Sequence, residues 1–331
     1  MNRDISLDIA SGFCLLIVIL GHIICFCDTP VNLFVIVDVF CFYLAFFFFK
    51  AGVCFKIRDR KNVVNNGFKR LIIPFIVYSL LSLFLVVVFK WVTIDWMNLK
   101  LSVIINAQEF LRDIYKMGAP QCNLALWFLP SLYVCRIISN CLLKYISNYA
   151  IVAIVVAIPL VCEIVKIYGG GREESLPFYL RNIPIGLSIM LMGYLLRNQL
   201  HKKSFFYIAS IVYIGIQMVY PSHLSVFDGR PRTGNYLTGE LAFLSGCVMI
   251  SGISRISNEL GAMSIFSYLG RHSMPYYCAH WIILTLIGCI PVLSNDVPYT
   301  RMFTMVLSCI LLLPLIDRLT KMKTLKWTIG E

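Results

Sequence analysis

Long apolar stretches separated by short polar ones run along nearly the whole chain, and this pattern predicts a bundle of membrane-spanning helices. A helix needs about 20 apolar residues to cross the hydrocarbon layer of a bilayer. Runs of roughly this length lie at residues 5–27, 31–49, 71–89, 123–143, 149–167, 181–197, 204–220, 237–254, 272–292 and 302–320. The expected fold class is therefore all-α, a polytopic integral membrane protein with about ten transmembrane helices in a single membrane-embedded domain over 1–331. The longest connection expected is 90–122.

The first apolar run carries polar side chains that share one face of the helix. At 100° per residue, Asp8, Ser11 and His22 fall within a sector of about 60°. Ionisable side chains inside a span are costly, so they usually face the protein interior or a water-filled cavity and mark function. Two interpretations stay open for His22: a functional group, or a hydrogen bond to a neighbouring helix that serves packing.

A second polar stripe is expected in the ninth run. Ser273, Tyr277 and His280 follow one another at spacings of four and three, which places them on one helix face. They either support a site or serve interhelical packing.

Three further residues in the apolar runs have open roles. Asp38 and Glu240 are acids inside the second and eighth runs, where they would pair with His22, His280 or an arginine, or form a proton path. Trp127 lies near the start of the fourth run, where the aromatic belt at a membrane interface commonly places tryptophan.

Composition agrees with the membrane assignment. Of the 331 residues, 59% are hydrophobic and 14% are charged, which excludes an ordinary soluble domain. The 13 cysteines mostly stand singly in apolar runs, where they act as small apolar fillers, and no metal-binding spacing is present.

The net charge of +12 reflects membrane topology rather than a nucleic-acid partner. With the N-terminus inside, most of the 29 Lys and Arg residues fall in cytoplasmic segments, and an even number of spans also places the C-terminus inside. The expected location is the inner (plasma) membrane, with both termini cytoplasmic and membrane lipid as a partner.

The second connection is strongly basic. It carries seven cations: Lys50, Lys56, Arg58, Arg60, Lys61, Lys69 and Arg70. Topology and contact with anionic lipid explain many such clusters. A cation pair at the mouth of a helix, here Lys69 and Arg70, also suits an anionic cytosolic ligand.

Several motifs resemble those of the membrane-bound acyltransferase family 3, which includes O-acetyltransferases that modify bacterial surface polysaccharides. The first helix shows R-x-x-x-L-D-x-x-x-G-x₉-H, formed by Arg3, Leu7, Asp8, Gly12 and His22. Four more follow in the family's order: FFFKAG at 47–52, KRLIIP at 69–74, LWFL at 126–129, and a late motif of Gly270, Ser273, Tyr277 and His280. The chain departs from the family's usual pattern at Ser11, Ala51 and Gly67, where a basic residue, a serine and an arginine are common.

The resemblance implies an enzyme, an acyltransferase that transfers groups other than aminoacyl groups. The donor would be cytosolic acyl-CoA, most simply acetyl-CoA, acting as a substrate rather than a bound cofactor. The acceptor would be a hydroxyl of a glycan or a lipid-linked sugar, giving O-acetylation in polysaccharide modification. The alternative is a transporter or exporter of a glycan or an acylated metabolite.

The residue roles follow from the chemistry. A sugar hydroxyl needs a base, and histidine titrates near neutrality, so His22 is the expected general base. Asp8 lies about 21 Å from His22 on a straight helix, so another residue must orient the imidazole. Phosphates of the donor are expected to bind a set of basic residues: Lys69, Arg70, Arg58 and Arg60.

Overall fold

The computed structural model describes residues 3–27, 37–93, 99–168, 178–227, 229–261, 263–288, 298–322 and 325–330. These residues form two compact units. The first unit comprises Met1–Val18, Val35–Asn65 and Val134–Ser273, and the second comprises Ile19–Phe34, Asn66–Tyr133 and Met274–Glu331. Helices α1 (Ile5–Cys25) and α7 (Phe128–Tyr145) contribute to both units, each of which is described by itself below.

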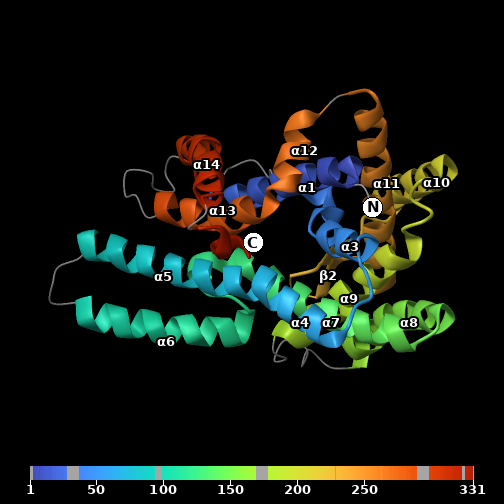
Figure 1. The fold of residues 1–331 in the computed structure, drawn as a ribbon, viewed down its shortest axis with the longest axis horizontal. Coiled ribbons are helices and arrows are strands. Elements are labelled where there is room, and N and C mark those ends of the chain that lie inside the picture. Colours follow the sequence, from blue (N-terminus) through green and yellow to red (C-terminus); the bar gives the residue numbers. More distant parts are fainter. Residues whose placement is uncertain are drawn as a thin grey trace. The chain divides into compact units, whose positions relative to one another are not determined.

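The regular structure of the first unit, over its described residues, consists of helices and one small hairpin. Besides its parts of α1 and α7, it contains η1 (Cys41–Tyr43), α3 (Ala45–Val53), most of α4 (Arg60–Gly67), α8 (Asn148–Tyr168), α9 (Phe178–Leu196), α10 (Lys203–Val219), α11 (Tyr236–Glu259) and α12 (Ser264–Arg271). Strands β1 (His223–Ser225) and β2 (Arg230–Thr233) pair antiparallel. Helices α10 and α11 lie side by side (Figure 1). The hairpin leads into α11, where Asn235 accepts from the Thr238 backbone in a capping box.

Glycines allow α3 and α9 to pack backbone against backbone. A Cβ at Gly52 of α3 would lie 1.9 Å from the Met190 carbonyl oxygen of α9, and one at Gly193 would lie 2.2 Å from the Phe49 carbonyl oxygen. Small residues at a helix contact permit this close approach, which is a common way for membrane helices to associate. Gly52 belongs to the FFFKAG motif, so the glycine of that motif has a packing role.

The second unit contains the C-terminal part of α1, the π-helix η2 (Phe68–Ile72), α5 (Ile73–Thr93), α6 (Leu99–Met117), the 3₁₀ segment η4 (Gln121–Trp127), α13 (Ser273–Gly288), α14 (Pro298–Thr320) and η7 (Lys326–Ile329). Helices α5 and α6 lie alongside each other (Figure 1). The segment η4 also packs on α5 and has a kink at Asn123, whose φ and ψ of −151° and 67° are not helical.

Six of the described helical stretches are long and apolar enough to cross a membrane: Ile5–Cys25, Arg60–Val88, Gln108–Tyr145, Asn148–Tyr168, Tyr236–Glu259 and Pro298–Thr320. Two shorter apolar helices, Arg181–Leu196 and Lys203–Val219, accompany them. An all-α membrane protein is thus supported, whereas the count of ten spans is not confirmed.

Three expected elements differ from the structure. In the second run, residues 31–36 lie outside the described part, and the remainder consists of short helical pieces rather than one continuous helix. The connection 90–122 contains the helix α6. The fourth run begins with the kinked 3₁₀ segment η4 instead of an α-helix.

Helix α1 is an interior helix. Of its apolar window, 78% is buried, against 17% for α8, whose Val152, Val156 and Ile164 are exposed. In a bilayer an exposed apolar face meets lipid, so polar side chains on a buried helix such as α1 face protein instead.

Candidate active site

The second unit brings two histidines together. His22, on the last turn of α1, and His280, on α13, approach with Nδ1 of His22 2.8 Å from Nε2 of His280. Their rings stack, with centroids 5.1 Å apart and planes within 8°. His280 is therefore the partner that orients the His22 imidazole, and Asp8 is not.

The hydrogen-bond network assigns the tautomers of this pair. Nδ1 of His280 lies 3.2 Å from the Tyr276 carbonyl oxygen, which can only accept, so Nδ1 of His280 carries the hydrogen. In the neutral ring Nε2 of His280 is then an acceptor, and Nδ1 of His22 donates to it. This arrangement leaves Nε2 of His22 with the lone pair. His280 is 0% exposed, whereas His22 is half-buried, so the unprotonated nitrogen belongs to the more accessible ring.

Aromatic side chains surround His22. The Trp281 ring meets the His22 imidazole nearly at right angles, with centroids 4.7 Å apart, and Phe26 packs against Trp281 at 5.3 Å. Nε1 of Trp281 is buried, and it has no hydrogen-bond partner among the residues that the structure describes. A buried N–H without a partner is rare in folded proteins and calls for an explanation.

Hydrogen bonds connect η4 to α13 on either side of the histidine. Nδ2 of Asn123 donates to the Cys278 carbonyl oxygen at 2.9 Å and to Oγ of Ser82 at 3.2 Å. The Tyr277 hydroxyl donates to the Ala125 carbonyl oxygen, and Oγ1 of Thr285 donates to that of Cys122 at 3.5 Å. These bonds hold the α13 segment that carries His280. The three residues of the expected stripe on α13 therefore have different surroundings. His280 contacts His22, Tyr277 bonds the Ala125 carbonyl oxygen, and Ser273 is the half-buried first residue of the helix.

Trp127 does not have the interfacial exposure expected of an aromatic belt. It ends the buried segment η4 and is only 4% exposed, with its ring edge-on to Phe128. The expectation failed because the apolar run begins with a 3₁₀ segment that packs on α5.

The first unit gathers cations around Asp8. This carboxylate, 2% exposed, lies 2.6 Å from Nε of Arg3, 3.1 Å from Nζ of Lys50 and 3.6 Å from Nε of Arg271. The hydrogen bond to Asp8 raises the pKa of Arg3, so this guanidinium stays charged. We call Arg3, Asp8, Ser11, Lys50 and Arg271 the Asp8 cluster.

Lys50 also contacts Ser11. Its Nζ donates to Oγ of Ser11 at 2.7 Å, and that hydroxyl donates in turn to the Leu7 carbonyl oxygen at 2.7 Å. A cation from α3 thus lies beside position 11 of α1, where the residue itself is uncharged. The sequence placed Lys50 in a basic connection and missed this role. The signal was a single lysine directly after four phenylalanines, which is an unusual setting for a charge.

Glycines also explain how Arg271 reaches Asp8. A Cβ at Gly12 would lie 2.0 Å from the Phe266 carbonyl oxygen, and one at Gly270 would lie 1.8 Å from that of Asp8. Helices α1 and α12 therefore cross with their backbones in contact, which brings Arg271 beside the carboxylate.

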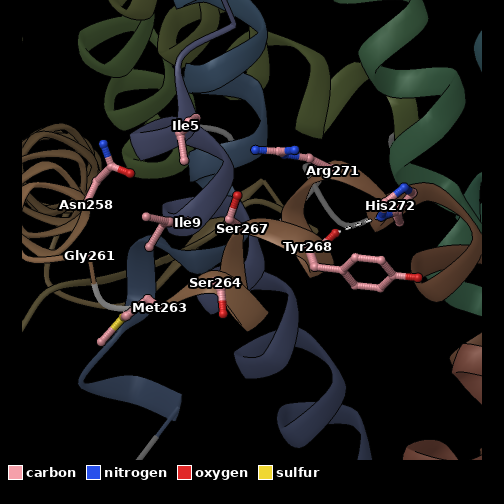
Figure 2. Close-up of a pocket in the computed structure, with 10 residues that line it drawn as sticks. All are labelled: Ile5, Ile9, Asn258, Gly261, Met263, Ser264, Ser267, Tyr268, Arg271 and His272. Carbon is pink, nitrogen blue, oxygen red and sulfur yellow. Dashed lines mark hydrogen bonds between the residues drawn. The ribbon is translucent and has the colours of Figure 1, made fainter.

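A pocket of about 420 Å³ opens beside this crossing, between the start of α1 and the segment from the end of α11 through α12. Its lining is Ile5, Ile9, Asn258, Gly261, Met263, Ser264, Ser267, Tyr268, Arg271 and His272. Figure 2 shows the Arg271 side chain extending toward α1 and the His272 ring next to Tyr268. Nδ1 of His272 donates to the Tyr268 carbonyl oxygen at 3.0 Å.

The basic residues expected to bind the donor fall in both units. Lys69 and Arg70 are exposed on η2 of the second unit. There Gly330 packs closely on them, since a Cβ at Gly330 would lie 2.5 Å from Cα of Arg70. Arg58 and Arg60 are exposed in the first unit, where Asn140 of α7 bonds the backbone of Arg58 at 3.0 and 2.9 Å.

The two acids inside the second and eighth runs have local partners in the first unit. Oδ1 of Asp38 lies 3.4 Å from Nδ1 of His223, and Glu240 on α11 accepts from the Ser188 hydroxyl on α9. The expected pairing of these acids with His22 or His280 is not found among the described contacts, where Asp38 lies beside His223 and Glu240 beside Ser188 instead.

A comparison with protein families finds one that covers nearly all of the chain. The model of Acyl_transf_3, described as an acyltransferase domain, matches residues 4–319 of the 331. Comparisons with curated proteins and with solved structures found no match.

Proposed function

Because this chain belongs to the acyltransferase family 3, we propose that it transfers an acyl group, most simply acetyl, from cytosolic acyl-CoA to a hydroxyl of a glycan or lipid-linked sugar. His22 is the general base in this proposal. The observation that carries it is the chain of contacts from His22 through His280 to the Tyr276 carbonyl oxygen. These two contacts leave Nε2 of His22 unprotonated and hold the ring in place.

The chemical step uses both ring nitrogens of His22. Nε2 takes the proton of the acceptor hydroxyl while the hydroxyl oxygen attacks the thioester carbonyl carbon. The C–O bond forms, the C–S bond then breaks, and the imidazolium returns its proton to the departing CoA thiolate. Nε2 of His280 accepts from Nδ1 of His22 throughout, and it stabilises the positive charge that His22 carries between the two transfers.

The donor is proposed to approach from the cytoplasmic side. Lys69 and Arg70, together with Arg58 and Arg60, are exposed cations that suit its phosphates. The proposed location is the inner (plasma) membrane, with both termini cytoplasmic. Family membership does not favour the transporter alternative, and the pairing of Glu240 with Ser188 gives this acid a local structural role.

The test is acyl transfer by the purified protein in detergent, with acetyl-CoA as donor and the released thiol as the signal. The variant His22→Gln keeps a side chain of similar size but cannot accept a proton at neutral pH. We expect it to lose at least about a hundredfold in rate, since general bases contribute about 10²–10⁴-fold. The wild-type rate should fall as pH drops through the imidazole pKa, because only the neutral ring accepts the proton.

The control is the binding of CoA to the same variant, which should be retained if the protein is folded. A structural histidine would tolerate Gln better than Ala. Normal acyl transfer by His22→Gln would show that the pair serves packing and that this mechanism is wrong.

A further inference from the structure

The Asp8 cluster carries more positive than negative charge. Arg3, Lys50 and Arg271 contact a single carboxylate, so two of the three charges are not neutralised by Asp8. The neighbouring acid Asp4 caps the first turn of α1, since its Oδ1 accepts from the backbone and hydroxyl of Ser6. Arg3 and Arg271 are exposed, so this excess positive charge is accessible to an anion.

Lys50 is the most enclosed of the three cations. Its side chain is 23% exposed, against 59% for Arg3 and 42% for Arg271. An ammonium has three hydrogens to donate, and Asp8 and Ser11 accept two of them. The two contacts fix the amine in position and leave it one further hydrogen bond for a ligand.

The pocket beside the cluster combines apolar side chains (Ile5, Ile9 and Met263) with one arginine and several hydrogen-bonding groups. Arg271 belongs both to its lining and to the cluster, and none of the ten lining residues is acidic. The hydroxyls of Ser264, Ser267 and Tyr268 and the amide of Asn258 add neutral hydrogen-bonding groups. Its volume of about 420 Å³ lies within the range of about 300–1,000 Å³ that is usual for small-molecule sites.

We propose that Lys50 and Arg271 form a phosphate-binding site in which the pocket holds a phosphate-bearing end of the acyl donor. Ser11 is a positioning residue that holds the Lys50 amine. The identity of the ligand rests on the proposed function, whereas the anion site rests on the cluster and the pocket. The cation beside position 11 is thus supplied by α3, although α1 has a serine there.

The test moves the charge between the two helices. Binding of CoA and of inorganic pyrophosphate to the purified protein in detergent is measured for Lys50→Ser, Ser11→Lys, and the double variant that exchanges the two residues. We expect Lys50→Ser to weaken binding of both probes at least about tenfold, as for the loss of a charge-assisted hydrogen bond. The exchanged variant should recover most of this loss, because it returns the amine to the same place.

The matched control is Lys56→Ser, which removes an exposed lysine shortly after α3 and should leave binding within about twofold. If Lys50→Ser does not fold, Lys50→Gln replaces it, and the exchanged variant provides the measure of recovery. Unchanged binding in a folded Lys50 variant, or an exchanged variant that binds no better than Lys50→Ser, would overturn the proposal.

Acyl transfer measured in parallel separates the two proposals. Lys50-dependent binding of pyrophosphate by a protein that transfers no acyl group would support the anion site and reject the enzyme. If the protein transfers acyl groups and its affinity for CoA does not change when Lys50 is replaced, the anion site is rejected and the proposed enzyme activity stands.

Discussion

The indole N–H of Trp281 is buried beside His22 and lacks a partner among the described residues. Leaving such a group unpaired costs about 1–3 kcal/mol. A donor next to the proposed general base suits the oxygen of the thioester carbonyl, where negative charge would develop during attack. The cost would then be recovered in the transition state, when the oxygen accepts from Nε1.

This role predicts the behaviour of Trp281→Phe, which keeps an aromatic ring but removes the donor. We expect kcat for acyl transfer to fall about tenfold or more, with KM for acetyl-CoA nearly unchanged. The control is Phe26→Leu, which alters the packing on Trp281 without touching a polar atom and should retain kcat. A wild-type kcat in Trp281→Phe would mean that the indole only packs.

At this scale the sequence singled out His22 as a candidate base but did not predict how its ring is oriented. His22 stands out because an ionisable side chain in an apolar run is costly. The sequence did not name its partner His280, because only the tertiary fold brings α1 and α13 together. The tautomer depends on the Tyr276 carbonyl oxygen, a backbone atom that no residue pattern reveals.

Among the elements, the crossing of α1 and α12 depends on two glycines of the sequence motifs. The Cβ of an alanine at position 270 would lie 1.8 Å from the Asp8 carbonyl oxygen, so Gly270→Ala must push the helices apart. We expect it to lower the free energy of unfolding by about 1–3 kcal/mol, as overpacking usually does. A lower Tm in detergent and weaker pyrophosphate binding would show this.

The control for this prediction is Gly215→Ala on α10, where a Cβ meets nothing within 4 Å. That change should leave Tm unchanged or raise it slightly, since alanine favours a helix more than glycine does. Equal Tm values for the two variants would show that the crossing tolerates a methyl group.

Hydropathy predicted long helices such as α1, α8, α11 and α14 well, because their length and apolar character are properties of local sequence. It could not predict η4. That segment is held in a kinked 3₁₀ form by hydrogen bonds from Asn123, Tyr277 and Thr285, which join residues more than 40 positions apart. Nor could it show that the amphipathic helix α6 lies in the connection 90–122, where no long apolar run is present.

For the molecule as a whole, the distribution of charge predicts the orientation in the membrane. Most Lys and Arg residues lie on the side that we assign to the cytoplasm, and the strongly basic segment 50–70 is the largest contributor. A reporter active only in the cytoplasm should therefore work when fused after Glu331, and the same reporter fused after Thr29 should be silent. Activity after Thr29 with silence after Glu331 would reverse the orientation.

The contact between Lys50 and Ser11 has a consequence for how such proteins diverge. Through substitutions at two positions, a positive charge can be lost from one helix and gained on a neighbouring helix, and it still occupies the same point in space if the two positions face each other. The order of substitutions then matters: a lineage that gained Lys50 before it lost a basic residue at position 11 never lacked the cation. Ancestors reconstructed along such a path would carry both charges at once. A motif compared position by position would score such a descendant as lacking the cation, although a lysine on the neighbouring helix would place the charge at the same point.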